Sequence, residues 1–202
     1  MYKKVNLNYQ SLEPIIDDKT LDLHYNKHYQ NYTDKLNQYL NDINYDYKLS
    51  AEELAKNISI LPIEYRNEIL YNLGGYLNHS LYFNILTDKM KEIPTPLLNE
   101  INKTFENINN FKLEFINMAL ELKGSGYTFL VLNKNNKLRI INMSNQDTPY
   151  YYSFKPIMSI DVWEHSYYLK YTYNKKEYLE NIFNIIDFTK VYENYKKEIE
   201  TN

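Results

Sequence analysis

The sequence predicts an α+β fold: a helical N-terminal domain with a long helical hairpin, then a C-terminal domain with a three-stranded antiparallel sheet flanked by helices. Three observations lead to this prediction. Before residue 90 the apolar residues recur at helical spacing. The prolines Pro94 and Pro96 then interrupt the helical pattern. Between residues 127 and 163, short apolar runs rich in β-branched and aromatic residues are typical of strands.

The N-terminal domain is expected to span residues 1–90. A long helix is predicted to begin at Thr20, which would cap it, and its apolar positions continue at helical spacing as far as residue 39. Ser50 and Glu53 have the spacing of a capping box and predict the start of a short helix. A further helix is expected over residues 62–86, with the glycine pair 74–75 as the place where it would break.

The C-terminal domain is expected to span residues 91–202. Helical patterns cover residues 97–107 and 110–122, and they return over 176–186 and 189–200. Between them, residues 127–132 and 138–143 predict a hairpin with its turn at 134–137, and residues 154–163 predict a third strand.

The composition excludes several kinds of site and partner. The 202 residues include no cysteine, which rules out disulfides, cysteine zinc sites, iron–sulfur clusters and a thiol nucleophile. The net charge of −3 argues against nucleic acid as a partner. We find neither a signal peptide nor an apolar run long enough for a membrane helix, so we expect a cytoplasmic protein without a membrane partner.

The histidines are the main candidates for chemistry: His24, His28, His79 and His165. His24 and His28 lie four residues apart and share a helix face, which by itself is more typical of packing than of metal binding. Asp161 lies four residues before His165, and histidines from two other segments would complete a set of three imidazoles and one carboxylate. Such a set suits manganese, iron, zinc or cobalt, and it leaves a coordination position open for solvent or substrate.

Six short segments carry a more specific signal, and they lie in this order along the chain: Ser11–Pro14 (SLEP), Leu23–Tyr32 (LHYNKHYQNY), Gly74–Ser80 (GGYLNHS), Gly124–Tyr127 (GSGY), Asn145–Pro149 (NQDTP) and Asp161–Leu169 (DVWEHSYYL). They resemble, in turn, the motifs ALEP, HHxKHHxxY, GGHxNHS, GSGW, NQDSP and DVWEHAYYL of the iron/manganese superoxide dismutase family. The last segment is the most specific. Together the six segments make the chain similar to this family over nearly its whole length.

The resemblance implies an enzyme that converts superoxide to oxygen and hydrogen peroxide while a manganese or iron ion cycles between +3 and +2. It implies one ion per subunit, placed between the two domains, with a solvent molecule as its fifth ligand. The implied protein ligands are His24, His79, Asp161 and His165.

The resemblance also implies roles for residues around the metal. Tyr32 would guard the substrate funnel, and His28 would lie near it without binding the metal. Gln146 would hydrogen-bond the metal-bound solvent and tune the redox potential, so Tyr32 and Gln146 are the expected catalytic residues. Trp163 would pack against the site.

A homodimer, or a tetramer built from dimers, is the expected assembly. By the same resemblance, Glu164 would reach the partner subunit's His165, and Tyr168 would reach the partner subunit's His28. We expect Glu164 to be buried, because it stands in an apolar stretch beside a metal ligand.

Several positions depart from the family pattern: Tyr76, Phe83, Tyr127, Phe129, Lys175, Phe183 and Phe188. All except Tyr76 fit a coding bias, since the chain has 23 tyrosines but one tryptophan and few arginines. Tyr127 would line the active-site cavity, so its change bears on turnover and product inhibition. Lys175 stands where the family has a funnel arginine, and it keeps a positive charge that can steer an anion.

Two questions stay open at this stage. In the family, manganese-type members carry the solvent-binding glutamine in the NQD segment and a glycine in the GGH segment, and here Gln146 and Gly75 follow that pattern. We therefore expect manganese in preference to iron.

The alternatives to a dismutase are a degenerate dismutase fold with a structural or metal-binding role, and a zinc hydrolase with Glu164 as its general base.

Overall fold

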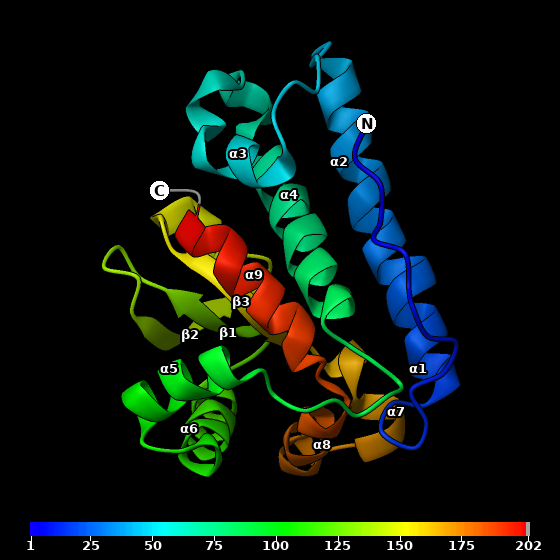
Figure 1. Cartoon of the computed structure of the whole chain (residues 1–202). Coiled ribbons are helices and arrows are strands. Elements are labelled where there is room, and N and C mark those ends of the chain that lie inside the picture. The colour runs from blue at the N-terminus through cyan, green and yellow to red at the C-terminus, as the bar shows by residue number, and fades with distance from the viewer. Residues whose placement is uncertain (201–202) are drawn as a thin grey trace.

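The computed structural model describes residues 1–200, and in that part it has the predicted α+β architecture (Figure 1). An N-terminal helical hairpin lies beside a C-terminal part built on a three-stranded antiparallel sheet. The last two residues of the predicted domain 91–202 lie outside the described residues. Within residues 1–200, no helix is long and apolar enough to cross a membrane.

The first long helix differs from its prediction at two points. It begins at Asp18 rather than Thr20, because Asp17 is the cap: its carboxylate accepts hydrogen bonds from the Thr20 amide at 2.9 Å and the Thr20 hydroxyl at 2.6 Å. It is also not one regular α-helix. It consists of α1 (Asp18–Leu23), the π-helical segment η1 (His24–Tyr29) and α2 (Gln30–Asp42). Such π-helical turns are frequent at functional sites.

The second arm of the hairpin is formed by α4 (Ile63–Asn84), which follows α3 (Ala51–Lys56) and η2 (Ile58–Ile60). The predicted capping box of α3 is confirmed, since the Ser50 and Glu53 side chains each accept the other residue's backbone N–H. The break expected at the glycine pair is wrong, because α4 continues through it. The pair serves close packing instead: a Cβ on Gly74 would lie 1.9 Å from the Gln146 carbonyl oxygen.

The C-terminal part begins with α5 (Thr95–Phe105) and α6 (Ile108–Glu121). The strands are β1 (Gly126–Leu132), β2 (Leu138–Ser144) and β3 (Lys155–Asp161), in the order β2-β1-β3. Short turns, η3 (Pro149–Tyr152) and η4 (Glu164–Ser166), flank β3. The helix α7 (Tyr168–Tyr171) was not predicted, and α8 (Lys175–Ile182), η5 (Phe183–Ile185) and α9 (Phe188–Glu200) follow it.

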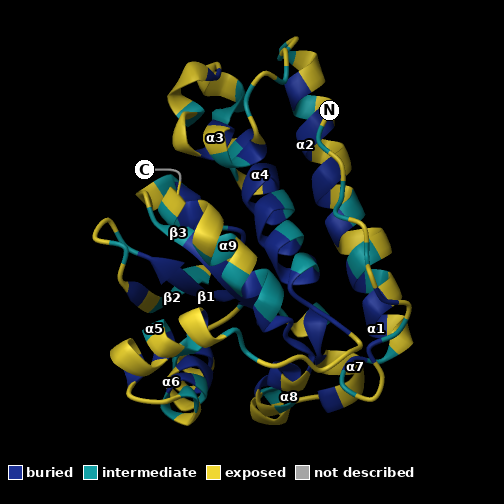
Figure 2. Cartoon of the chain, viewed as in Figure 1, coloured by how far each residue is buried: buried dark blue, intermediate teal, exposed yellow. Residues whose placement is uncertain are grey.

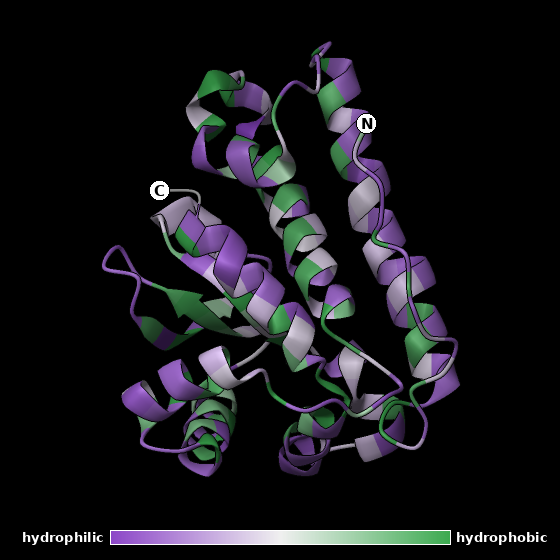
Figure 3. Cartoon of the chain, in the orientation of Figure 1, coloured by the Kyte–Doolittle hydropathy of each residue, from purple (hydrophilic) through white to green (hydrophobic). Residues whose placement is uncertain are grey.

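The three-stranded sheet lies in the interior of the protein and is covered by helices. Helix α6 packs against β1 and β2, while α4 and α9 pack against β3. All seven residues of β1 are buried, and the central strands and α4 are dark in Figure 2. The hydropathy colouring of Figure 3 follows this burial: the strands inside are apolar, and the outer faces of α2 and α9 are polar. In the register of β1 and β3, Tyr127 is the partner of Asp161, so both lie at one end of the sheet.

The close packing of α4 gives a stability prediction. Replacing Gly74 by Ala should normally help a helix, by about 1 kcal/mol. Here the added Cβ would overlap the Gln146 carbonyl, so we expect Gly74→Ala to lower the free energy of unfolding by about 1–3 kcal/mol, as overpacked cores do. Chemical denaturation measures this change. The control is Asn67→Ala, at an exposed position of the same helix. A Gly74→Ala variant as stable as this control would contradict the packing argument.

Candidate metal centre

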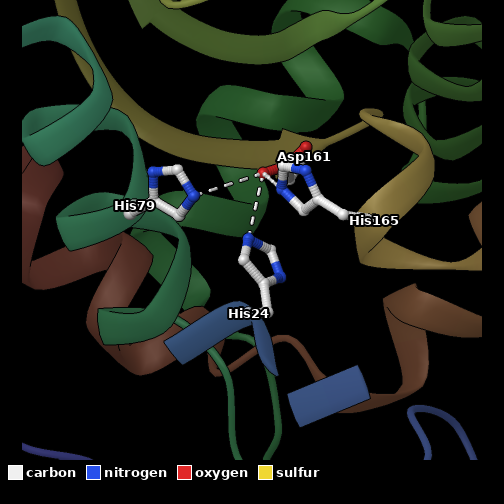
Figure 4. Close-up of side chains that lie close together, drawn as sticks. All are labelled: His24, His79, Asp161 and His165. Carbon is white, nitrogen blue, oxygen red and sulfur yellow. Dashed lines mark hydrogen bonds and ion pairs between the residues drawn. The ribbon is translucent and has the colours of Figure 1, made fainter. Parts of the chain in front are cut away.

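Four side chains from four separate elements converge at the end of the sheet nearest the hairpin. They are His24 from η1, His79 from α4, Asp161 from the end of β3 and His165 from η4. Figure 4 shows them pointing toward one another. One nitrogen or oxygen atom of each lies within 4.8 Å of the corresponding atoms of the others. The structure therefore brings together the four residues that the sequence analysis selected as metal ligands.

A single oxygen of Asp161 forms the centre of this cluster. Its Oδ2 lies 3.1 Å from Nε2 of His24, 3.4 Å from Nε2 of His165 and 3.9 Å from Nε2 of His79. The side chains of Asp161 and His79 have no exposed surface, and that of His24 is 2% exposed. The three imidazoles thus share one carboxylate in a nearly water-free space.

Neighbouring groups orient these side chains. The backbone N–H of Trp163 donates to Asp161 Oδ1 at 2.8 Å, which leaves Oδ2 to face the histidines. The Tyr178 hydroxyl donates to the Asp161 carbonyl at 2.9 Å and holds the end of the strand. His79 Nδ1 lies 2.6 Å from the carbonyl oxygen of Gly75 and must donate to it, so Nε2 carries the free lone pair. Such outer contacts typically fix the tautomer of metal-binding histidines.

The charge states suit metal ligation. Burial lowers the pKa of His24 to about 4, although the hydrogen bond to Asp161 opposes it. Burial also lowers the pKa of His79 well below its ordinary value, with His24 adding to the effect. Burial alone would raise the pKa of the Asp161 carboxyl, but His165 and His24 outweigh it and hold that pKa below its usual range. At neutral pH the ring of His24 is therefore neutral, as a ligand must be, and the carboxylate is ionised.

The donor set fits a manganese or iron ion. Imidazole and carboxylate ligands lie about 2.0–2.2 Å from a transition metal, so donors of one site are separated by at most about 4 Å, close to the size of this cluster. His165 Nε2 is buried and has no hydrogen-bond partner in the described residues. A buried polar atom without a partner is unfavourable, and a metal ion would supply that partner. Three nitrogens and one carboxylate oxygen are typical donors for manganese, iron and zinc.

Gln146 and Tyr32 lie together beside the cluster. Gln146 is 1% exposed, and its Nε2 donates to the Tyr32 hydroxyl at 3.1 Å. Its Oε1 is buried with no hydrogen-bond partner among the described residues. The ring of Tyr32 lies 5.3 Å from the ring of His79. It occupies the space that a side chain at position 75 would need, since a Cβ on Gly75 would lie 2.5 Å from the Tyr32 ring.

Two further aromatic residues contact the cluster. The Tyr127 hydroxyl lies 3.2 Å from Nδ1 and 3.3 Å from Nε2 of His79. Burial, together with the nearby Asp161, raises the pKa of Tyr127 well above its ordinary value, so its hydroxyl keeps its proton. The Trp163 ring stacks on His165 at 5.6 Å, and its Nε1 donates to the Asn145 carbonyl at 3.1 Å. The Trp163 ring thus contacts one of the four clustered side chains.

The residues expected at a dimer interface lie on the surface. His28 stacks on His165 with ring centroids 4.0 Å apart and is itself exposed. Tyr168 is 49% exposed. Glu164 is exposed too, so the expectation that it is buried is wrong for the single chain. Glu164 is the first residue of the short turn η4, and its side chain faces solvent while Ser166 of the same turn is buried.

Lys175, at the start of α8, contacts the end of α6. Its ammonium group donates to the carbonyl oxygens of Ala119, at 3.1 Å, and Leu122, at 3.4 Å, near the end of α6. Burial lowers the pKa of Lys175. Its contacts in the described residues therefore stabilise a helix end.

The sequence analysis missed two residues near the site. Tyr178 holds the carbonyl of Asp161, and no sequence signal distinguishes it from the many other tyrosines. Tyr71 contacts Tyr32, with ring centroids 5.9 Å apart. Its position offered a signal, because Tyr71 lies four residues before Gly75 and therefore on the same face of α4.

Comparisons with known proteins agree with this site. Residues 2–87 match the family description "Iron/manganese superoxide dismutases, alpha-hairpin domain", and residues 94–194 match the corresponding C-terminal domain. The chain is 38% identical over 188 residues to "Superoxide dismutase [Mn/Fe] 2" of Staphylococcus aureus strain bovine RF122 / ET3-1, which covers 93% of each protein. It is 37% identical, with the same coverage, to the proteins of that name from strains Mu50 / ATCC 700699 and N315. The chain belongs to the iron/manganese superoxide dismutase family, and it is a superoxide dismutase with a manganese or iron site of four ligands.

Proposed function

We propose that this superoxide dismutase binds one ion per subunit through His24, His79, Asp161 and His165, and that it prefers manganese to iron. The observation that carries the assignment of ligands is the convergence of three Nε2 atoms on one carboxylate oxygen. We further propose that the chain divides into domains at residues 1–90 and 91–202. The ligands then come from both domains, with two from each. A cytoplasmic location stays a prediction.

The preference for manganese rests on where the glutamine comes from. Gln146 reaches the site from the segment after β2, and its Nε2 contacts Tyr32. No side chain fits at Gly75, because the ring of Tyr32 occupies that space. A glutamine from α4 is therefore sterically excluded, which supports the manganese-type arrangement. The relatives from Staphylococcus aureus are named for both metals, so iron is the competing outcome.

When bound, the metal ion supplies one-electron chemistry by cycling between +3 and +2. The protein residues control access and protons. The buried cluster excludes bulk water, so the superoxide anion meets fixed groups rather than solvent. We propose that the Tyr32 hydroxyl donates a proton during reduction of superoxide to hydrogen peroxide. Gln146 Nε2 donates to the oxygen of that hydroxyl and so fixes its position.

Tyr127 and Lys175 would modify the reaction rather than perform it. Tyr127 places a protonated hydroxyl against His79, where the family has an indole. We propose that it affects turnover and product inhibition through this contact. Lys175 would act as a fixed positive charge on the path of the anion, from its position at the start of α8, where it contacts the last turn of α6.

We propose that the active assembly is a homodimer, or a tetramer of such dimers. An exposed apolar patch supports this proposal: Tyr168 is 49%, Leu169 54% and Tyr173 90% exposed. Such patches commonly mark protein interfaces. The patch follows His165, whose ring remains 14% exposed and can be reached from outside the chain. Glu164 of one subunit would then accept a hydrogen bond from the partner subunit's His165, and Tyr168 would meet the partner subunit's His28.

Metal content and activity test the ligands. Asp161→Ala and His79→Ala should lose most of the metal and the dismutase activity, because each removes a donor from a buried cluster. With metal in large excess over its dissociation constant, we expect these variants to lose about 3–4 kcal/mol of ligand-linked stability. The measurements are elemental analysis, superoxide decay and thermal unfolding. Asp88→Ala, at an exposed position, is the control. Full metal content and activity in either variant would refute the site.

The metal preference is tested at Gln146. Gln146→Leu should keep most of its metal and lose about 10–100-fold in activity, as changes to groups around metal ligands typically do. Wild type and variant are reconstituted with manganese and with iron, and superoxide decay and reduction potential are measured. Gln10→Leu, on the surface, is the control. Higher wild-type activity with iron, or an unaffected variant, would contradict the proposed role. Wild-type protein without dismutase activity would favour a structural or hydrolytic alternative.

The dimer is tested at Glu164. Glu164→Ala should weaken association and reduce metal retention, because the ring of the ligand His165 loses its outer hydrogen-bond acceptor. Light scattering gives the mass at micromolar concentration, and elemental analysis gives the metal. Glu180→Ala, exposed on α8, is the control. A variant that stays dimeric, metal-loaded and active would contradict the proposed hydrogen bond between subunits, without contradicting the metal site.

A further inference from the structure

We propose that the crevice between α4 and α9 is a binding site for a small aliphatic amine, bound as its ammonium ion, with the buried carboxylate of Glu198 as its main partner. None of the four clustered residues of the metal centre lines this crevice. The proposal therefore does not rest on the proposed function, and the failure of either one would not contradict the other.

Two helices that pack on the same strand leave the crevice between them. Both α4 and α9 pack against β3, and in Figure 1 they lie beside each other with α3 above them. The crevice has a volume of about 240 Å³. From α4 it is lined by residues at the spacing of a single helix face, Leu77, Ser80, Leu81 and Asn84. His79 points from the opposite face of α4, so the crevice is separate from the metal centre.

A buried carboxylate faces this crevice. Glu198 is 8% exposed and is part of the crevice lining. It stands seven residues after the buried Val191, on the inner face of α9, where an apolar side chain is typical. The ammonium group of Lys155 donates to the main-chain carbonyl of Glu198 at 2.6 Å. Within residues 1–200 no hydrogen bond or ion pair reaches the carboxylate itself, and a charge buried without a partner is unfavourable. A cationic ligand would supply that partner.

The charges around the crevice favour a ligand with one positive charge. The lining includes two carboxylates, those of Glu52 and Glu198, and one ammonium group, that of Lys197. Lys197 Nζ lies 3.7 Å from Glu52 Oε1, and its side chain is 66% exposed, so this pair lies at the mouth of the crevice. Burial raises the pKa of Tyr150 well above its ordinary value and both carboxylates add to the effect, so both lie near one buried hydroxyl. With Glu52 paired, the carboxylate of Glu198 is the one that a ligand can meet.

The remaining lining selects an organic cation over an inorganic one. Four apolar side chains wall the crevice: Val5, Leu77, Leu81 and Pro156. A short alkyl chain would bury these walls, as the stem of a lysine does on an apolar surface, whereas an inorganic ion would leave them against water. The amide nitrogen of Asn194 donates to the Ile157 carbonyl at 3.0 Å, so its Oδ1 can accept from the ammonium group. The crevice is several times larger than the share of about 30 Å³ that one water molecule occupies, so a chain of a few carbon atoms fits.

Isothermal titration calorimetry tests the site, with butylammonium chloride as the probe and the whole manganese-loaded enzyme at constant ionic strength. Glu198→Gln keeps the size of the side chain and removes its charge. We expect wild type to bind the probe at millimolar concentration, and Glu198→Gln to bind it about 10-fold or more weakly, because hydrogen bonds to charged groups are the stronger ones. The control is Glu193→Gln, which removes the same charge from an exposed position of the same helix and should bind as wild type does.

Further ligands test what the crevice recognises. Butan-1-ol has the same alkyl chain without the charge, and we expect it to bind much more weakly than butylammonium. Equal binding of the two would contradict recognition by a carboxylate. Potassium and calcium chloride test an inorganic ion, and binding of either one without binding of butylammonium would overturn the amine proposal. The site itself is wrong if wild type does not bind butylammonium, or if Glu198→Gln binds it equally well.

The stability of the same variants tests the buried charge directly. Without the amine, Glu198→Gln should have a higher free energy of unfolding than wild type, because it removes a buried charge that has no partner. With butylammonium present, wild type should gain stability and Glu198→Gln should not. Chemical denaturation measures both effects, and neither depends on dismutase activity. A Glu198→Gln variant less stable than Glu193→Gln would mean that the carboxylate already has a partner, which would overturn the proposal.

Discussion

The buried carboxylate of Asp161 is the interaction on which the rest of the structure depends. An ionised carboxylate without solvent is strongly unfavourable unless it is paired and hydrogen-bonded. Here it has no exposed surface, accepts a hydrogen bond from the Trp163 amide on one oxygen and faces three imidazoles with the other. Those imidazoles belong to η1, α4 and η4, so the groups that face this carboxylate come from both the helical hairpin and the C-terminal part. A bound metal ion would hold these elements together more strongly, because it forms additional bonds to the same donor atoms.

Local features of the helical hairpin bring its two histidines, His24 and His79, to this carboxylate. The π-helical segment η1 widens the first arm where His24 points inward. On the second arm, α4 carries two glycines where other helices carry side chains. Gly74 admits the backbone of Gln146, and Gly75 admits the ring of Tyr32. The second contact places the ring of Tyr32 beside His79, which lies one turn after Gly75 on the same helix face.

The aromatic residues around the metal centre carry more hydroxyl groups than the family pattern predicts. Tyr127 directs its hydroxyl at His79, where an indole would place a larger apolar ring. The half-exposed ring of Tyr71 packs against the ring of Tyr32, with centroids 5.9 Å apart. A bias that spreads tyrosine through the sequence therefore has a local chemical effect. At several positions the tyrosine hydroxyl donates to a backbone carbonyl, as Tyr151 does to Leu70. Beside the cluster, the hydroxyl of Tyr127 contacts the ring of His79.

The sequence by itself determined the order of helices and strands, the capping box at Ser50, and the four residues that meet at the metal centre. These features are local, or they depend on motifs whose spacing is visible in one dimension. The tertiary structure alone decided the rest. Whether the glycines of α4 end the helix or admit a neighbour depends on what packs there, and the carbonyl of Gln146 does. Glu164 stands in an apolar stretch but is exposed, because its side chain is on the solvent side of the turn η4 while Ser166 is on the buried side. The contact of Tyr71 with Tyr32 joins two helices that the sequence separates, and residue types alone do not reveal which of 23 tyrosines will meet.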